Sequence, residues 1–260
     1  MELPLHHMTT QKHWADIVLN SSTLQQIDQL RSWLAQHAGL VNQKNKLKDG
    51  YLVLLYGPDG TGKSTAASIL AKEISTDIYR VDLAATVSKY IGETEKNLAR
   101  IFDMAEQKGW ILFFDEADAL FGKRTEVKDS HDRYANLDVN YLLQRIENYN
   151  GLVILASNMK SNIDDAFTRR FQSIIHFPPP TKEERKRIWE MAFAENDLIS
   201  SETKLNDLAE AYELTPASIV AVTDSIKIKL AAKEQISNEQ LAKMIQVEYD
   251  KLMPGQKNDS

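Results

Sequence analysis

Apolar residues in the first two thirds of the chain fall into short runs separated by longer amphipathic stretches. The runs at 51–56, 110–114 and 152–156 are continuously apolar, which is typical of strands covered by helices on both faces of a parallel sheet. Strands are predicted at 51–56, 78–83, 110–114, 152–156 and 173–177, and helices at 24–38, 64–74, 93–107 and 137–148. This alternation predicts an α/β fold, a doubly wound parallel five-stranded sheet with its ligand at the carboxyl ends of the strands.

The pattern changes after three consecutive prolines at 178–180, and no further strand is predicted. A capping box at 181–184, a Thr-Pro pair at 215–216 and a second capping box at 237–240 each mark the start of a helix. Together with an apolar stripe at 205–212, these signals predict a small four-helix lid. The predicted domains are an N-terminal arm or linker at 1–19, an α/β domain at 20–178, the helical lid at 179–253 and a frayed tail at 254–260.

Composition narrows the function classes. The 260 residues include 31 Lys and Arg against 37 Asp and Glu, a net charge of −6, so a large affinity for nucleic acid by charge alone is not expected. The sequence contains no cysteine, which excludes disulfides, thiolate nucleophiles and cysteine-ligated zinc. No apolar run is long enough to span a bilayer, and the N-terminal residues lack the pattern of a signal peptide. We therefore expect a globular cytoplasmic protein that does not insert into a membrane.

A glycine-rich loop between the first predicted strand and the helix after it carries the strongest chemical signal. Its sequence, Gly-Pro-Asp-Gly-Thr-Gly-Lys-Ser, fits the phosphate-binding pattern G-x-x-x-x-G-K-[ST]. The glycines let the backbone curl so that several N–H groups point at a phosphate, and the helix N-terminus adds positive potential. We expect Lys63 to contact the β- and γ-phosphates of ATP and Ser64 to bind Mg²⁺, with Asp59 facing away because phosphates repel a carboxylate. The predicted ATP-binding residues of the loop are Gly57, Pro58, Asp59, Gly60, Thr61, Gly62, Lys63, Ser64 and Thr65.

Two carboxylates follow the predicted strand at 110–114. We expect Asp115 to hold Mg²⁺ and Glu116 to act as the general base that activates the attacking water. The four residues from Asp115 onwards also spell the DEAD signature of a helicase superfamily. Those helicases need two nucleotide-type lobes, whereas this chain has predicted strands for one sheet only, so a helicase is disfavoured.

The order of these motifs resembles the AAA+ ATPases, specifically the AAA subfamily of protein-remodelling enzymes, over residues 13–252. The resemblance implies that Asn158, after the fourth strand, orients the lytic water and senses the γ-phosphate. The segment that ends in Arg169 and Arg170 is similar to the one that carries arginine fingers in this family. Such fingers act across a subunit interface, and the sequence leaves open which of the two arginines touches the γ-phosphate.

Two further segments extend the resemblance, one to the linker beside the adenine base and one to the lid. Residues 14–19 are similar to the linker that packs beside adenine, which implies base recognition by Asp16 and Ile17. No arginine occurs at 214–219, where many AAA+ proteins outside this subfamily place a second sensor. Its absence favours the AAA subfamily.

A third segment resembles a loop that contacts the substrate of the ATP cycle. Tyr90, Ile91 and Gly92 resemble the loop that lines the central pore of hexameric protein translocases. An exposed aromatic ring can intercalate between the side chains of an extended polypeptide with little sequence preference. The polar residues at 122–136 are either a second pore loop or a surface loop.

Two functions follow as hypotheses from the resemblance. The first is Mg-dependent ATP hydrolysis that drives protein remodelling, unfolding or disassembly by a nucleotide-dependent hexameric ring with a central pore. The alternative is a nucleotide-gated assembly factor, in which the ATP cycle controls a ring or complex without threading a substrate. A nucleic-acid motor is a distant third, since no basic stripe interleaved with aromatics occurs. Within the subfamily, the motifs look most like bacterial AAA ATPases encoded beside contractile, phage-tail-like injection particles.

Overall fold

The structure is a computed structural model that describes residues 3–41, 50–86, 93–117, 140–158, 168–193, 202–232 and 238–252. The chain divides into two compact units. The first comprises Met1–Lys12, Ser21–Pro58 and Lys63–Phe177, and the second His13–Asn20, Asp59–Gly62 and Pro178–Ser260. The predicted domain boundaries after residues 19, 178 and 253 stay a prediction, because compactness alone does not define a domain that folds independently.

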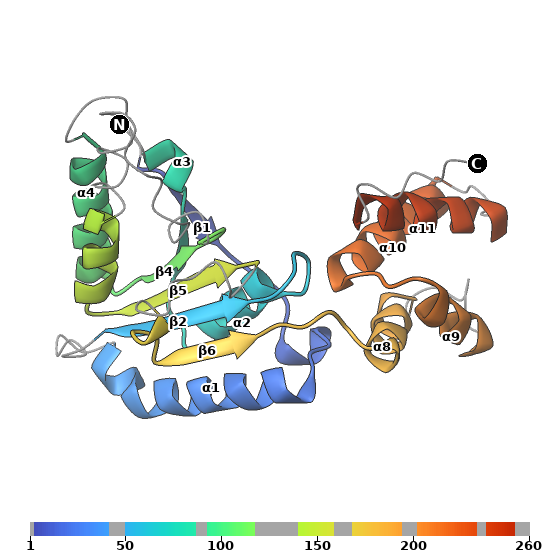
Figure 1. Cartoon of the computed structure of the whole chain (residues 1–260), viewed down its shortest axis with the longest axis horizontal. Helices are drawn as coiled ribbons and strands as arrows, with labels where there is room; N and C mark the ends of the chain where they lie inside the picture. The colour runs from blue at the N-terminus through green and yellow to red at the C-terminus, as the bar shows by residue number, and fades with distance from the viewer. Residues whose placement is uncertain are drawn as a thin grey trace. The chain divides into compact units, whose positions relative to one another are not determined.

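The first unit is built on one six-stranded sheet (Figure 1). Its strands lie in the order β1-β3-β4-β5-β2-β6, and every neighbouring pair is parallel except β1 and β3. The strands are β1 (Leu5–Met8), β2 (Tyr51–Tyr56), β3 (Ile78–Val81), β4 (Ile111–Phe114), β5 (Leu152–Ser157) and β6 (Ser173–His176). The five predicted strands are therefore confirmed, in a parallel arrangement.

The sixth strand, β1, is a correction to the predicted five-stranded sheet. It lies in residues that were predicted to be an arm, and it pairs antiparallel with β3, Leu5 opposite Val81 and Met8 opposite Ile78. The backbone N–H of Asp82 also donates to the carbonyl of Pro4 over 3.0 Å. The two central residues of β1 are exposed histidines, so this strand has no apolar run by which the sequence could reveal it.

The helices of the first unit follow the predicted order with one difference. They are α1 (Ser21–Val41), α2 (Lys63–Glu73), α3 (Leu83–Thr86) and α4 (Glu93–Lys108), and residues 140–148 are also helical. The predicted strand at 78–83 ends at Val81, and Leu83 instead begins α3. The reason is Asp82, whose Oδ1 accepts a hydrogen bond from the N–H of Ala85 over 2.9 Å and so starts a helical turn.

Both faces of the central strands are buried, as their continuous apolar runs predict. On β2, Leu52 and Leu54 belong to a core cluster with Leu98 and Phe102 of α4. The alternating residue Val53 is also fully buried, on the opposite face. Figure 1 shows α4 and the helix at 140–148 side by side over the first of these faces.

The edge of the sheet at β6 is covered by side chains of α1, which runs alongside it (Figure 1). Thr23 is fully buried, and its Oγ1 donates to the carbonyl of His176 over 2.6 Å. Gln26 Nε2 donates to the carbonyl of Ile174 over 3.2 Å, and Gln26 Oε1 accepts from the N–H of His176 over 3.4 Å. Three backbone groups along this edge, the N–H and carbonyl of His176 and the carbonyl of Ile174, are therefore satisfied by side chains of α1.

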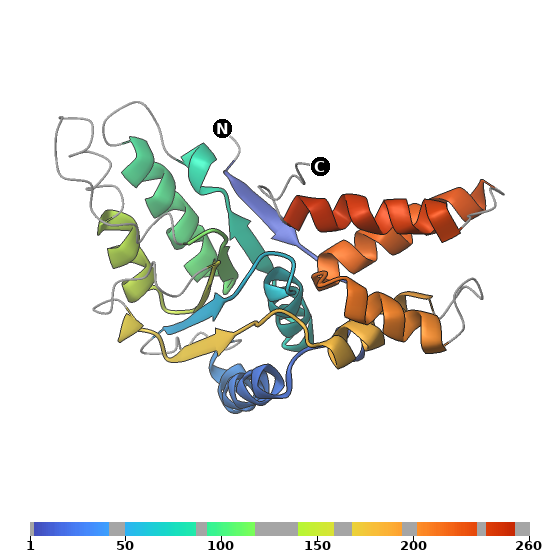
Figure 2. The same ribbon diagram turned by 45° about the vertical axis from the view of Figure 1, so that its right-hand side comes forward.

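The second unit contains the four predicted lid helices (Figure 2). They are α8 (Lys182–Phe193), α9 (Glu202–Ala211), α10 (Pro216–Ala231) and α11 (Asn238–Leu252), with η1 (Trp14–Asp16) as a short 3-10 helix from the linker. Their apolar residues form one cluster around the fully buried Trp189 and Ile219. Among the described helices of the chain, none is both long enough and apolar enough to cross a membrane.

The predicted helix starts of the second unit are confirmed where the structure describes them. Thr181 and Glu184 form a reciprocal capping box, each side chain accepting from the other residue's N–H over 2.9 and 3.2 Å. Thr215 Oγ1 accepts from the N–H of Ser218 over 3.3 Å, with proline at the first helical position of α10. The second predicted capping box starts at Ser237, which lies outside the described residues.

Candidate functional site: the carboxyl ends of the central strands

Lys63, at the start of α2, is almost fully buried and is held by three oxygen atoms. Its Nζ donates to the carbonyls of Gly57 and Pro58 over 2.6 and 3.0 Å. It also lies 3.3 Å from Oδ1 of Asn158, at the end of β5. The structure thus brings together two residues that are 95 positions apart in the sequence, a basic group of the glycine-rich loop and the predicted sensor amide.

Gly57 occupies a position that admits no side chain. Its φ angle is +147°, and a Cβ placed there would lie 2.0 Å from the backbone oxygen of Phe177. Its N–H donates to the carbonyl of Ser157 over 3.1 Å, which ties the start of the loop to β5. The first glycine of the pattern is therefore required by the close approach of a neighbouring backbone.

The middle of the loop also needs glycine, for its backbone conformation. Gly60 and Gly62 have φ angles of +75° and +103°, a region that residues with a Cβ rarely adopt. Thr61 between them is buried, and Asp59 is exposed. Asp59 therefore faces outward as expected, and the alternating conformations curl the loop as a phosphate cradle requires.

The two carboxylates of the acidic pair follow β4 directly. Glu116 has a φ angle of +51°, which is strained for a residue with a side chain. The conformation is held on both sides: Asp115 Oδ1 accepts from the N–H of Glu116 over 3.1 Å, and Ala117 donates to the carbonyl of Ala156 over 2.8 Å. Strained backbone of this kind concentrates at functional sites.

The strand order gathers these residues along one edge of the sheet. Because β4, β5 and β2 are adjacent and parallel, Asp115, Asn158 and Lys63 follow the carboxyl ends of three neighbouring strands. Ser64 lies next to Lys63 in the first turn of α2, so the predicted Mg²⁺ ligands are a hydroxyl and a carboxylate. The described residues contain no group of three or more His, Cys, Asp or Glu that could hold a metal. The pair nevertheless fits Mg²⁺, which takes one or two protein ligands and keeps water for the rest.

The two predicted arginine fingers lie at the other end of the sheet. Gln172, just after them, pairs with Leu52 at the start of β2: its N–H donates to the carbonyl of Leu52 over 3.0 Å, and its Oε1 accepts from the N–H of Leu52 over 2.7 Å. Both arginines are exposed, and Arg170 forms an ion pair with Glu147. Sequence reasoning missed Glu147, because a single acid on an exposed helix face carries no local signal.

Comparison with known proteins agrees with this geometry. Residues 53–179 match the family model described as ATPase family associated with various cellular activities (AAA). The chain carries an AAA-family ATPase domain. The predicted family, the α/β fold and the class of enzyme, an ATPase, are thereby confirmed.

The AAA domain has similar relatives in distant organisms. The chain is 37% identical over 145 residues to "Cell division protein C" of Sulfolobus acidocaldarius, 52% of this chain. It is 30% identical over 195 residues to "Uncharacterized AAA family ATPase y4kL" of Sinorhizobium fredii, 74% of this chain. It is 31% identical over 166 residues to "Vacuolar protein sorting-associated protein 4" of Dictyostelium discoideum, 62% of this chain. The aligned regions cover 39%, 58% and 37% of these relatives' own lengths, respectively.

The remaining predicted contacts of the AAA domain keep the status of predictions. Asp16 lies in η1, where its Oδ2 accepts from the N–H of His13 over 2.7 Å, so its carboxylate already serves a local turn. Base recognition by Asp16 and Ile17 is not decided by this geometry. The predicted pore loop, Tyr90 to Gly92, and the polar loop at 122–136 lie outside the described residues.

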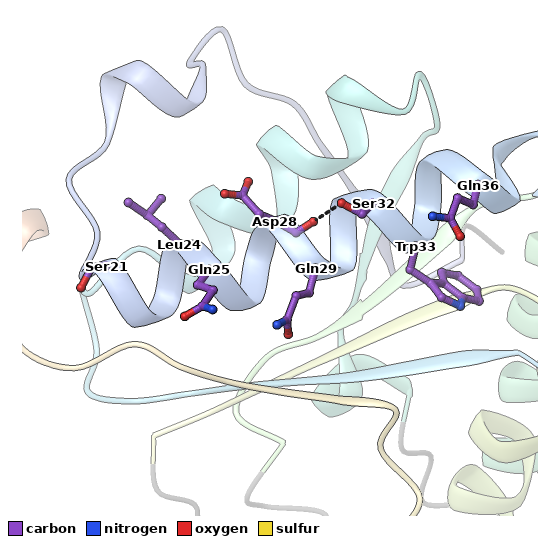
Figure 3. A pocket seen from close by; sticks show the side chains of 8 residues that line it. All are labelled: Ser21, Leu24, Gln25, Asp28, Gln29, Ser32, Trp33 and Gln36. Carbon is purple, nitrogen blue, oxygen red and sulfur yellow. Dashed lines mark hydrogen bonds between the residues drawn. The ribbon is translucent and has the colours of Figure 1, made fainter.

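A shallow hollow of about 690 Å³ runs along one face of α1. Figure 3 shows its lining side chains, all of which come from that helix and several of which carry amides or hydroxyls. Its described lining contains one carboxylate, Asp28, and no basic group, so it lacks the cations that phosphates need. The lining residues are Ser21, Leu24, Gln25, Asp28, Gln29, Ser32, Trp33 and Gln36.

Proposed function

We propose that this AAA domain hydrolyses ATP to ADP and phosphate in an assembly of copies, each of which completes the active site of its neighbour. Hydrolysis would drive the remodelling of a protein substrate by a hexameric ring in the cytoplasm. ATP and Mg²⁺ are the proposed cofactors, and the family match to residues 53–179 supports nucleotide binding.

The residues at the carboxyl edge have distinct proposed roles. Lys63 binds the β- and γ-phosphates, exchanging its carbonyl partners for the stronger, charge-assisted bonds to phosphate oxygens. Ser64 and Asp115 would hold Mg²⁺, which neutralises charge on the phosphates when bound. Glu116 accepts a proton from the attacking water, and Asn158 orients that water.

The main support for a shared site is that the arginine turn and the phosphate loop lie at opposite ends of the sheet. Gln172 pairs with Leu52, and Gly57 follows the other end of the same strand. Five residues of strand at about 3.3 Å each separate these ends by about 17 Å. This distance exceeds the length of an arginine side chain, so the arginine turn of one chain cannot serve that chain's own phosphate loop. A neighbouring copy, by contrast, can present its turn to that loop.

Dilution tests the shared site. We expect ATP turnover per chain to fall at least about ten-fold as the assembly dissociates, since removing an arginine finger costs about 10³-fold or more. The measurement is phosphate release over a concentration series, with sedimentation velocity on the same samples. Full turnover in material that sediments as a monomer would overturn the proposal.

The proposed substrate is an extended protein chain contacted by Tyr90, Ile91 and Gly92. The support is the resemblance of this segment to pore loops and the similarity of the domain to AAA ATPases such as "Cell division cycle protein 48 homolog" of Archaeoglobus fulgidus, 30% identical over 207 residues. An assembly factor without threading would share the ATP site but would not need the aromatic ring of Tyr90.

Replacing Tyr90 by alanine separates these two functions. We expect Tyr90→Ala to keep basal ATP turnover within about two-fold and to abolish the unfolding of a tagged model substrate, because the ring is the group that grips between side chains. Tyr90→Phe is the control and should keep unfolding. Unfolding that survives in Tyr90→Ala would instead favour the assembly factor.

A further inference from the structure

The tip of the phosphate loop groups with the lid rather than with the sheet. Asp59–Gly62 belong to the second compact unit, whereas Ser21–Pro58 and Lys63–Phe177, on either side of the tip, belong to the first. The loop is therefore joined at both ends to the unit that carries Lys63, while its tip makes its contacts with the helical unit.

Gly60, at this tip, lies against the start of α10. The N–H of Ala217 donates to the carbonyl of Gly60 over 3.1 Å. A Cβ placed on Gly60 would lie 2.7 Å from Oγ1 of Thr215 and 2.9 Å from Cβ of Ala217, so the two segments touch without room for a side chain. Glycine is therefore required here by this contact as well as by its φ angle of +75°. We call Thr215, Pro216 and Ala217 the lid turn.

The lid turn is fixed to the core of the lid. Leu214, just before it, and Ile219, one helical turn later, are both buried in the apolar cluster of the second unit. Thr215 Oγ1 accepts from the N–H of Ser218 over 3.3 Å, which stabilises the first turn of α10. The group that holds Gly60 is therefore a rigid part of the lid and moves only with it.

The N–H groups of the lid turn are already engaged. The start of a helix usually offers free N–H groups that can bind an anion. In α10, however, Pro216 has no N–H, Ala217 donates to Gly60, and Ser218 donates to Thr215. These side chains also carry no charge. Any effect of the lid turn on the phosphates of ATP therefore passes through the loop.

We propose that the lid turn is a positioning element, which holds Gly60 so that the phosphate loop is curled before the phosphates arrive. This inference rests on the proposed binding of phosphates by the loop. A glycine-rich segment loses much conformational entropy when it is ordered, and a loop that is ordered in advance does not pay this cost on binding. Movement of the lid then changes the affinity of the loop for phosphates, without contact between the lid turn and the nucleotide.

Ala217→Pro removes the contact from the side of the lid. Proline is accepted in the first turn of a helix, but it has no N–H to donate to Gly60. We expect the dissociation constant of a labelled ATP analogue, measured by fluorescence anisotropy, to rise about three- to ten-fold, the effect of one neutral hydrogen bond. The kcat at saturating ATP should stay within about two-fold, because lost ground-state binding raises KM alone. Pro216→Ala leaves the donor of Ala217 in place and is the matched control. An unchanged dissociation constant in Ala217→Pro would overturn the inference.

Variants on the side of the loop test the same contact without a proline. Gly60→Ala places a methyl group against the lid turn, and Thr215→Gly removes the Oγ1 and Cβ atoms that this methyl would meet, while glycine remains acceptable as a helix cap. We expect Gly60→Ala to weaken ATP binding about five-fold or more, as crowding in a close contact does. The double variant should recover part of this loss, because the two changes act on one contact.

Gly62→Ala controls for backbone strain in this comparison. Its φ angle of +103° also disfavours a side chain, but a Cβ there would lie 4.0 Å from Leu19 Cδ2, an ordinary contact distance. Thr215→Gly should therefore not improve ATP binding by Gly62→Ala. Effects of Gly60→Ala and Thr215→Gly that simply add would show that the lid turn does not act on the loop.

Inorganic tripolyphosphate separates this inference from the function on which it rests. The probe has no base and no sugar, so its competition with the labelled ATP analogue reports the binding of phosphates alone. We expect Ala217→Pro to lose the same factor of affinity for tripolyphosphate as for ATP. Weaker binding of ATP with undiminished binding of tripolyphosphate would overturn the inference, since the lid turn would then act on the base or the sugar. If tripolyphosphate does not bind the unchanged chain, or binds Lys63→Ala equally well, the proposed role of the loop itself is wrong.

Discussion

Replacing Glu116 by glutamine is expected to lower ATP hydrolysis by about 10²- to 10⁴-fold, the usual contribution of a general base. Glutamine has nearly the same shape but cannot take a proton from the attacking water. Because Lys63 and the loop are untouched, ATP should still bind, and the bound nucleotide should hold the copies together. Phosphate release, calorimetric titration with ATP and size-exclusion chromatography measure the three expected results.

The backbone at Glu116 supplies a matched comparison. Its φ angle of +51° strains any residue with a side chain and costs about 1 kcal/mol or more, whereas glycine adopts this conformation freely. Glu116→Gly should therefore lose hydrolysis like Glu116→Gln but melt at an equal or higher temperature than the glutamine variant. Turnover that persists in both variants would show that the general base is another residue.

Replacing Lys63 by alanine is expected to weaken ATP binding by about 100-fold or more. The loss follows from the charge-assisted hydrogen bonds between the ammonium and the phosphates, worth up to about 3 kcal/mol. The position of Lys63 supports a large effect, because its side chain is buried and held by Gly57, Pro58 and Asn158 at the head of the loop. Fluorescence anisotropy of a labelled ATP analogue gives the dissociation constant.

Lys72, on the same helix, provides the control for charge and helix composition. Its ammonium donates to the carbonyls of Gln11 and Lys12 over 2.9 and 3.3 Å, at an exposed position. Lys72→Ala should leave ATP affinity within about two-fold of the unchanged chain. An equal loss of affinity in both variants would mean that Lys63 has no specific role at the phosphates.

The central strands could be predicted because a strand that is buried on both faces shows a continuous apolar run in its own sequence. A run such as Tyr51–Tyr56 must lie between two layers, and the glycine pattern after it fits a sharp turn into α2. Gly57 illustrates why the motif is readable: its close contact with Phe177 tolerates only one residue type. Where the backbone accepts only one residue type, that residue in the sequence is enough to predict the local structure.

The strand β1 could not be predicted, because its stability comes from the partner strand rather than from its own composition. His6 and His7 are exposed and lie opposite Arg80 and Tyr79 of β3, where the His7 ring stacks on that of Tyr79, and Leu5 packs against the core cluster. The helical start at Leu83 was missed for a related reason, since an Asp between apolar residues reads equally as an interruption of a strand. Both outcomes were decided by hydrogen bonds that a linear pattern does not contain.

The sequence names candidate site residues one by one, but it does not reveal their pairings. The motifs named Lys63, Glu116 and Asn158, yet the hydrogen bond between Lys63 and Asn158 depends on the order of strands in the sheet. The ion pair of Arg170 with Glu147 likewise joins residues from separate elements. Such pairings are long-range, and a single sequence encodes them only through the complete fold.

The side chains of Thr23 and Gln26 along β6 have a consequence for self-association. They engage the N–H and the carbonyl of His176 and the carbonyl of Ile174, so fewer main-chain groups on that margin of the sheet are open to a foreign strand. On the opposite margin, β3 is occupied by β1, a strand of only four residues. Both features reduce the chance that strands of separate molecules pair edge to edge.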